Sequence, residues 1–310
     1  MPRKFRFGIQ TSRAPTGEAW TDKARKIEDL GFSTLFMPDH FEDQFAPMPA
    51  LMAVAGATTS LRVGTLVFDN DYRHPLVLAK ELATLDVLSG GRLEVGIGAG
   101  WMRSDYDQSG IAHDPPGVRI DRLRESLTIL KGLFADEPFS FSGRHYHVQN
   151  HNGTPKPAQR PHPPILIGGG GKRVLRLAAR EADIVGVNFS LAEGVVNPTV
   201  AQTGSAAATA EKIGWIREGA GPRFEELELN VTVFVTAVTE DRAAFAERIA
   251  GGFALTPAEV LESPHVLVGS VDQIVDDLQR RREEFGFSYV VFSGDLYEQT
   301  APIVKRLAGA

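Results

Sequence analysis

The sequence predicts a (β/α)8 barrel of the TIM type with loop insertions, and three observations support this prediction. Short apolar runs alternate with longer amphipathic stretches along all 310 residues. Eight of the short runs are strand-like, and a chain that alternates strands with helices forms a parallel sheet with right-handed crossovers. Glycine or polar residues directly follow several runs, where such folds place their functional sites. Eight units over this length favour a closed barrel over an open doubly wound sheet, and we expect residues 1–310 to form one domain.

The predicted strands are nearly continuous in apolar residues, as expected of strands buried in a parallel sheet. The segments between them repeat apolar residues at helical spacing, and the first of these segments stops at Gly31. The eight predicted strands are residues 5–11, 34–37, 62–67, 93–98, 165–167, 184–187, 227–237 and 289–292. The predicted helices are residues 18–30, 48–58, 76–88, 120–134, 174–180, 206–218, 241–249, 257–261, 271–285 and a terminal helix that ends near residue 307.

Loop insertions interrupt this alternation. Residues 139–148 predict a small hairpin that turns at Ser142-Gly143. A proline-rich linker follows at residues 155–164. Residues 191–204 combine glycine, proline and asparagine with little periodicity, so we expect a loop insertion there that could serve as a lid.

Composition excludes several classes of function. The net charge is −6 and no long basic block occurs, so nothing favours a nucleic acid or an anionic membrane surface as a partner. The absence of cysteine excludes disulfides, cysteine nucleophiles and thiolate metal sites. No apolar run reaches the roughly 18 residues of a membrane span, and the basic start lacks the apolar stretch of a signal peptide. We therefore expect a cytoplasmic protein.

Three histidines raise the question of a metal site. His145 and His147 alternate on one predicted strand and could share a face, and His151 follows. No acidic residue stands with them at a spacing diagnostic of metal ligation. We therefore expect a solvated hairpin face and no metal.

Asp39 and His40 directly follow the second predicted strand, at the edge where a parallel α/β fold builds its site. Imidazole takes up or releases a proton near neutral pH, and a carboxylate is a hydrogen-bond acceptor. The alternative is that Asp39 caps the next segment and His40 is a partly buried surface residue. On a barrel, the same rim would also collect Thr11-Ser12, residues 69–74 and Asn188.

Two glycine-rich segments also end strands. Gly168 to Gly171 precede a predicted helix that begins with Lys172-Arg173, and a helix start behind glycines is a natural phosphate site. A tight turn is the alternative. Gly96, Gly98 and Gly100 remove side chains where the fourth strand meets the rim, which could let a flat ring lie against the backbone beside Trp101. Ordinary packing of small residues is the alternative there.

Together these segments resemble the bacterial luciferase-like monooxygenase superfamily, and within it the branch that uses the deazaflavin coenzyme F420. The resemblance spans nearly the whole chain. The similar segments are residues 36–41, 63–67, 72–75, 90–101, 164–170 and 268–274.

The resemblance implies a luciferase-like TIM barrel with the cofactor across the carboxyl ends of its strands. It implies that Asp39 and His40 contact the deazaflavin, with His40 as proton acceptor or donor. It further implies a non-proline cis peptide at Leu66–Val67, so that Thr65, Leu66 and Val67 bulge against the ring. Gly98 and Trp101 would line the ring site, and Gly168, Gly169 and Gly170 would hold the cofactor phosphate. The acidic residue usual in the sugar-phosphate dehydrogenases of this family is not evident at residues 101–103, which argues against a sugar phosphate substrate.

The leading functional hypothesis is an F420-dependent oxidoreductase that transfers a hydride between the deazaflavin and a small organic substrate. The first alternative is an FMN-dependent monooxygenase that uses reduced flavin and oxygen, with residues 191–204 as its lid. The second is a non-catalytic protein that binds or carries a cofactor. We also expect a homodimer, paired through the C-terminal helices and the helix at 48–58.

Overall fold

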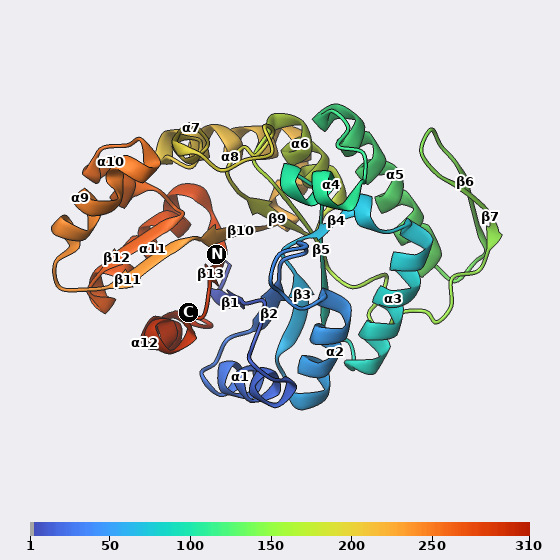
Figure 1. The fold of residues 1–310 in the computed structure, drawn as a ribbon, viewed down its shortest axis with the longest axis horizontal. Coiled ribbons are helices and arrows are strands. Elements are labelled where there is room, and N and C mark those ends of the chain that lie inside the picture. The colour runs from blue at the N-terminus through green and yellow to red at the C-terminus, as the bar shows by residue number, and fades with distance from the viewer. Residues whose placement is uncertain (1–2) are drawn as a thin grey trace.

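The computed structural model describes residues 3–310, and within them eight parallel strands close into a barrel surrounded by helices (Figure 1). The strands follow one another around the barrel in chain order, and the first and last are hydrogen-bonded neighbours. They are β1 (Arg6–Gln10), β2 (Thr34–Met37), β3 (Arg62–Thr65), β5 (Leu93–Gly98), β8 (Ile165–Gly169), β9 (Ile184–Val187), β10 (Glu228–Val233) and β13 (Phe287–Ser293). This arrangement confirms the predicted fold class.

Helices pack around the barrel, and α11 (Val271–Phe285) shows how local signals set their ends. Ser270 and Gln273 form a capping box at the start of α11, and Gly286 ends that helix in the left-handed conformation. The surrounding helices are α1 (Gly17–Asp29), α2 (Pro47–Ala57), α3 (Pro75–Leu88), α5 (Pro116–Phe134), α6 (Lys172–Glu181), α8 (Ala206–Ala220), α11 (Val271–Phe285) and α12 (Tyr297–Leu307). No helix within residues 3–310 is both long enough and apolar enough to cross a membrane.

The apolar core is divided by the barrel wall. Leu35 and Met37 of β2 belong to the large cluster that packs against the helices, whereas Phe36 between them belongs to a smaller cluster. Successive strand residues point to opposite faces, so the smaller cluster fills the barrel interior. Leu66 and Val67 pack against this interior cluster. They therefore lie where the filled interior meets the site described below.

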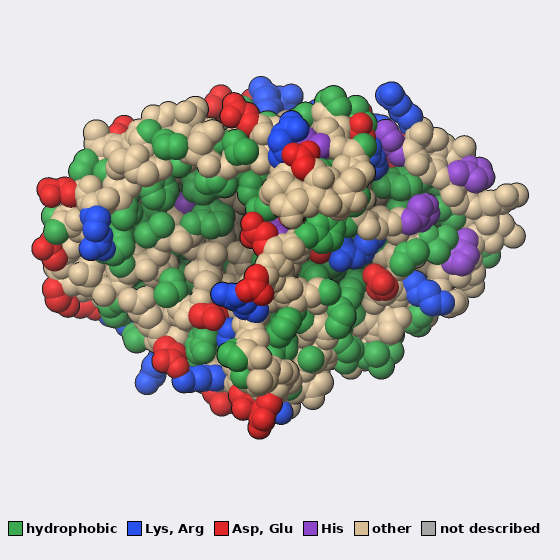
Figure 2. All heavy atoms as spheres, viewed as in Figure 1, with side chains coloured by type: hydrophobic (Ala, Val, Ile, Leu, Met, Phe, Trp, Pro, Cys, Tyr) green, Lys and Arg blue, Asp and Glu red, His purple; other side chains and the backbone are tan. Residues whose placement is uncertain are grey.

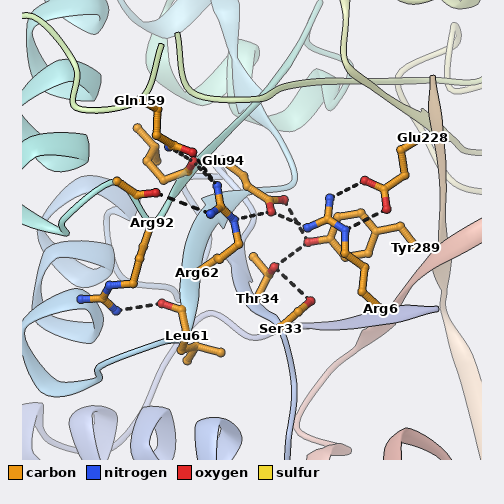
Figure 3. Close-up of polar contacts among 12 residues, drawn as sticks. Arg6, Ser33, Thr34, Leu61, Arg62, Arg92, Glu94, Gln159, Glu228 and Tyr289 are labelled. Carbon is orange, nitrogen blue, oxygen red and sulfur yellow. Dashed lines mark hydrogen bonds and ion pairs between the residues drawn. The ribbon is translucent and has the colours of Figure 1, made fainter. Parts of the chain in front are cut away.

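An ion-pair network lies among residues at the amino-terminal ends of the strands (Figure 3). Glu94 is 1% exposed and accepts hydrogen bonds from Arg6, Arg62 and Tyr289. Arg6 also pairs with Glu228. In a barrel of this type, the amino-terminal end serves stability rather than function.

The largest difference from the prediction concerns residues 227–237, which were expected to form one strand. The run divides at Phe234: β10 stays in the barrel, while β11 (Val235–Val238) pairs with β12 (Val266–Gly269) in a separate two-stranded sheet. With α9 (Arg242–Phe253) and α10 (Pro257–Glu262), this sheet surrounds its own small apolar cluster. The local apolar pattern marked a strand but carried no information about its partner.

Several shorter elements complete the fold. The predicted hairpin is present as β6 (Phe139–Ser142) and β7 (His147–His151), and Figure 2 shows histidines gathered on that side of the molecule. No group of three or more metal-binding side chains is found within residues 3–310. The helices α4 (Arg103–Ser109) and α7 (Pro198–Gln202), the strand β4 (Phe68–Asp69) and two short 3-10 helices, η1 (Asn70–Tyr72) and η2 (Gly221–Glu226), were not predicted.

Candidate active site

A cavity of about 950 Å³ opens at the carboxyl-terminal ends of the barrel strands. Its size is at the upper end of the range for small-molecule and cofactor sites, roughly 300–1,000 Å³. Figure 2 shows apolar side chains around a hollow between the α9–α10 side and the centre of the view. The predicted site residues that line the cavity are Asp39, His40, Leu66, Val67, Gly98, Trp101, Gly168, Gly169 and Gly170.

His40 is held by a carboxylate that the sequence analysis did not identify. Its Nδ1 lies 2.7 Å from Oδ2 of Asp105 on α4, and the Asp105 side chain is only 3% exposed. An ionised carboxylate can only accept, so Nδ1 carries a hydrogen and Nε2 of a neutral His40 is left as the proton acceptor. The Trp101 ring stands edge-on to the imidazole, with 5.7 Å between ring centroids.

Tyr72 supports Asp105 from a second side. Its hydroxyl donates to Oδ2 of Asp105 at 3.0 Å, and the backbone N–H of Phe41 lies 3.4 Å from Oδ1. Burial, together with the charges of Asp69 and Asp105, raises the pKa of Tyr72, so its hydroxyl stays protonated and remains a donor. The imidazole and its carboxylate are therefore fixed by three separate parts of the chain.

The carboxylate of Asp39 pairs with Arg73, although Asp39 is adjacent to His40 in the sequence. This carboxylate accepts from both terminal nitrogens of Arg73, at 2.5 and 3.1 Å, and from the backbone N–H of Asp69 at 3.1 Å. The two adjacent side chains therefore have different partners, Arg73 for Asp39 and Asp105 for His40. The acidic side chain that follows the fourth barrel strand is Asp105, which contacts His40 but does not line the cavity.

The peptide bond Leu66–Val67 is cis, which confirms the expectation drawn from the family resemblance. Val67 packs over strand-end glycines: a Cβ on Gly98 would lie 2.7 Å from Val67 Cγ2, and one on Gly168 would lie 3.2 Å from Val67 Cγ1. Gln10 donates to the carbonyl of Leu66 at 2.8 Å. Thr65 does not line the cavity, because it is fully buried and donates its hydroxyl to the carbonyl of Gly96.

Gly168 to Gly171 form one wall of the cavity and lead into α6. Gly171 is the N-cap, no side chain caps the helix start, and a Cβ at Gly171 would meet nothing within 4 Å. Backbone N–H groups at an uncapped helix start, with Lys172 beside them, suit a phosphate group. The guanidinium of Arg173 is paired with Asp121 at 2.7 Å. The arrangement fits the phosphate of a flavin or deazaflavin, with the cavity floor at Val67 left for its ring.

The segment at 191–204 forms part of the same cavity. Leu191, Ala192, Val196 and Ala201 line it, and Asn197 caps α7 by accepting from the N–H of Val200. The carbonyl of Gly194 accepts from the N–H of Arg103 at 3.1 Å. The segment thus reaches the loop that follows β5 and carries Trp101.

A sequence model of the luciferase-like monooxygenase family matches residues 4–256. Over 230 residues the chain is 31% identical to an FMNH2-dependent dimethylsulfone monooxygenase of Pseudomonas putida, which covers 72% of this chain and 58% of that protein. Over 271 residues it is 29% identical to an F420-dependent glucose-6-phosphate dehydrogenase of Nakamurella multipartita, which covers 83% of this chain and 76% of that protein. The chain therefore spans less than two thirds of the length of the first of these relatives.

Solved structures share the fold at low sequence identity. The coenzyme F420-dependent tetrahydromethanopterin reductase of Methanopyrus kandleri superposes with a TM-score of 0.77 at 20% identity, over 99% of both chains. A long-chain alkane monooxygenase superposes with a TM-score of 0.76 at 15% identity, over 99% of this chain and 92% of the other. With the family match over most of its length, the chain belongs to the luciferase-like monooxygenase family, whose compared members are oxidoreductases.

Proposed function

We propose that the protein is an F420-dependent oxidoreductase that transfers a hydride between the deazaflavin and a small organic substrate. The observation that carries this proposal is His40, which is fixed by Asp105 at the wall of a cavity suited to a flat, phosphate-bearing cofactor. Relatives that use F420 and relatives that use FMN are both similar to this chain. The choice of F420 follows the resemblance of the strand-end segments.

The residues that would hold the cofactor come from several strand ends. The Leu66–Val67 bulge and Gly98 would support the ring, with Asp39 and Trp101 at its edges, and Gly168 to Gly170 would face its phosphate. When bound, the deazaflavin would supply the hydride-accepting and hydride-donating centre. The protein's own contribution is then to bind, to exclude water and to move a proton.

His40 would move that proton. As substrate is oxidised, Nε2 takes the proton of a substrate hydroxyl or similar group, and the charged imidazole is stabilised by Asp105 at Nδ1. In the opposite direction, Nε2 returns the proton. Tyr72 and the Phe41 N–H keep Asp105 in place while the imidazole changes its charge.

Binding titrations of the full chain with F420 and with FMN, followed by fluorescence, test the choice of cofactor. Turnover is then measured on a panel of alcohols, enones and imines. We expect F420 to bind, and His40→Ala to spare binding while lowering turnover by at least about 100-fold. Tight FMN binding without F420 binding would refute the proposal.

The FMN-dependent monooxygenase remains the second candidate, because the segment at 191–204 lines the cavity and reaches the loop after β5. A lid that excludes water is what oxygen chemistry on reduced flavin requires. Oxygen consumption that depends on reduced flavin would favour this candidate. Cofactor binding without turnover on any substrate would favour a binding protein instead.

We also propose that the protein is a homodimer. Helix α3 carries three exposed apolar side chains: Val77 (50% exposed), Val87 (44%) and Leu88 (61%). Helix α2, at residues 47–57, packs beside α3. Light scattering of the purified protein tests this proposal, and a monomer at micromolar concentration would contradict it.

A further inference from the structure

Asp69 lines the cavity without a basic side chain as its partner, unlike the carboxylates around it. Asp39 pairs with Arg73, Asp71 with Arg122 at 2.8 Å, and Asp105 with His40. Within residues 3–310, no lysine, arginine or histidine nitrogen lies within 4.0 Å of the Asp69 carboxylate, and Asp69 is only 6% exposed. A buried carboxylate in this position has little to stabilise its charge.

The hydroxyl of Tyr106 contacts the carboxylates of both Asp69 and Asp71, but it has only one hydrogen to donate. Its hydroxyl oxygen lies 3.0 Å from Oδ2 of Asp69 and 3.0 Å from Oδ2 of Asp71. One hydroxyl donates one hydrogen, so both contacts are hydrogen bonds only if one carboxyl group is protonated. Arg122 stabilises the charge of Asp71 and nothing equivalent stabilises Asp69, so the proton belongs on Asp69.

Besides Tyr106, the Asp69 carboxylate accepts one backbone hydrogen bond, from the N–H of Asp71 to Oδ1 at 2.9 Å, and this bond brings no positive charge. Gly100, at φ +74°, packs its backbone against the Asp69 carboxylate and the Tyr106 hydroxyl, where a Cβ would collide with both. The other titratable groups close to Asp69 are Asp39, Asp71 and Tyr72, and none of them is a cation. Burial, together with the charges of Asp71 and Asp39, raises the pKa of Asp69 to about 7.

Arg119, which also contacts Gly100, presents the opposite situation. It is 2% exposed, lines the cavity, and donates to the carbonyl of Gly100 at 2.8 Å, yet its Nε has no partner. Within residues 3–310 no carboxylate lies within 4.0 Å of its guanidinium, which stands 5.7 Å from the ring centre of Tyr106. A buried guanidinium without a carboxylate at a cavity wall is suited to an anionic group of a ligand.

We propose that the wall at Gly100 is an anion subsite in which Arg119 supplies the charge and Asp69 takes part as a neutral carboxylic acid. A phosphate or carboxylate group of the ligand then binds only while Asp69 carries its proton. Ionised Asp69 would offset the field of Arg119 and repel the anion. The inference rests on the proposed function only for the identity of the anionic ligand.

Infrared titration of the full chain without ligand tests the protonation of Asp69. The wild type should show a carboxylic acid band that disappears as pH rises through about 7. An ordinary aspartate, with a pKa of about 4, would lose its band at a much lower pH. Asp69→Asn should lack this band, and the control Asp114→Asn, which changes the outer partner of Arg122, should keep it. A wild-type protein without such a band, or a band that persists in Asp69→Asn, would overturn the assignment.

Ligand titration tests the subsite with inorganic phosphate as the probe, since the phosphate of the cofactor is already assigned to Gly168 to Gly170. Wild-type affinity should fall by up to about tenfold per pH unit above about 7, since each unit reduces the protonated fraction tenfold. Asp69→Asn mimics the neutral acid and should remove this fall, while Arg119→Met should weaken binding at every pH and Arg119→Lys should restore part of it. The titration of the ligand itself is common to all variants. An Arg119→Met protein that binds like the wild type would refute the subsite, and this result is distinct from a wrong choice between F420 and FMN.

Discussion

Asp105 affects the chemistry only through the ring of His40, so a single hydrogen bond can be tested on its own. Asp105→Asn keeps the shape of the side chain but removes the charge that orients and stabilises the imidazole. We expect turnover to fall by about 100-fold, toward the lower end of what general acid–base groups contribute, with cofactor affinity nearly unchanged. Steady-state kinetics across pH and a binding titration measure the two effects.

Asp107→Asn is the matched control for this prediction. Asp107 lies on the same helix, α4, but is exposed, so the same change of charge there should leave turnover unaltered. Equal losses in both variants would mean that α4 itself, and not the hydrogen bond to His40, accounts for the effect.

His40 was identifiable from the sequence, because an imidazole directly after a buried strand is visible in the chain itself. Its partner was not, since Asp105 lies 65 residues away on a helix that was not predicted. Arg119 was missed as well, and Arg73, although inside the predicted rim segment 69–74, was not foreseen as the partner of Asp39. Side chains that meet only after the barrel closes leave no local pattern in the sequence.

A substitution at Gly98 tests how closely the end of β5 packs against Val67. In Gly98→Ala the new Cβ would lie 2.7 Å from Val67 Cγ2, so we expect a loss of about 1–3 kcal/mol of stability and weaker cofactor binding. Gly56→Ala is the control, because a Cβ there meets nothing within 4 Å and should stabilise helix α2 by up to about 1 kcal/mol. Denaturant unfolding measures both, and a fully stable Gly98→Ala would contradict the packing argument.

At the scale of elements, the segment at 191–204 is fixed at its base by one buried lysine. Nζ of Lys212 on α8 donates to the carbonyls of Asn188 and Thr203, at 2.7 and 2.6 Å. Lys212→Met nearly keeps the length of the side chain but removes both hydrogen bonds. This change should lower the free energy of local unfolding of the segment by about 1–3 kcal/mol. We expect Lys212→Met to speed hydrogen exchange at residues 189–203 more than in the barrel strands. The exposed control Lys305→Met should leave the exchange rates unchanged.

Two elements show the limits of sequence patterns at this scale. Residues 103–109 are mostly polar with no apolar repeat, so nothing in the sequence indicated helix α4, which carries Asp105. Residues 227–237 read as one strand because both halves are apolar, although the second half pairs outside the barrel with β12. In both cases tertiary partners decide the structure, and the local pattern does not contain them.

At the scale of the whole molecule, the barrel followed from the sequence because its determinants are repeated. Eight apolar runs separated by helices leave few topologies open, and an error in one strand boundary does not change the outcome. The rim position of the site follows from that topology for every strand end at once. The hydrogen-bond pairing within the rim has no such repetition, which is why the sequence indicated the rim as the candidate site but not the partners within it.

The two ends of the barrel should therefore separate stability from function. Glu94 stands at the amino-terminal end of β5 with Arg6, Arg62 and Tyr289 (Figure 3), about 13 Å along the strand from Gly98 at the cavity. Glu94→Gln leaves two arginines without this buried partner and should cost about 3–5 kcal/mol of unfolding free energy, while cofactor affinity below the unfolding transition stays unchanged. The exposed pair of Glu298 and Lys26 supplies the control, since solvent screens this pair and Glu298→Gln should leave the unfolding free energy nearly unchanged. Denaturant unfolding and a binding titration on the same samples measure both quantities, and a parallel loss of affinity in Glu94→Gln would show that the amino-terminal end also shapes the site.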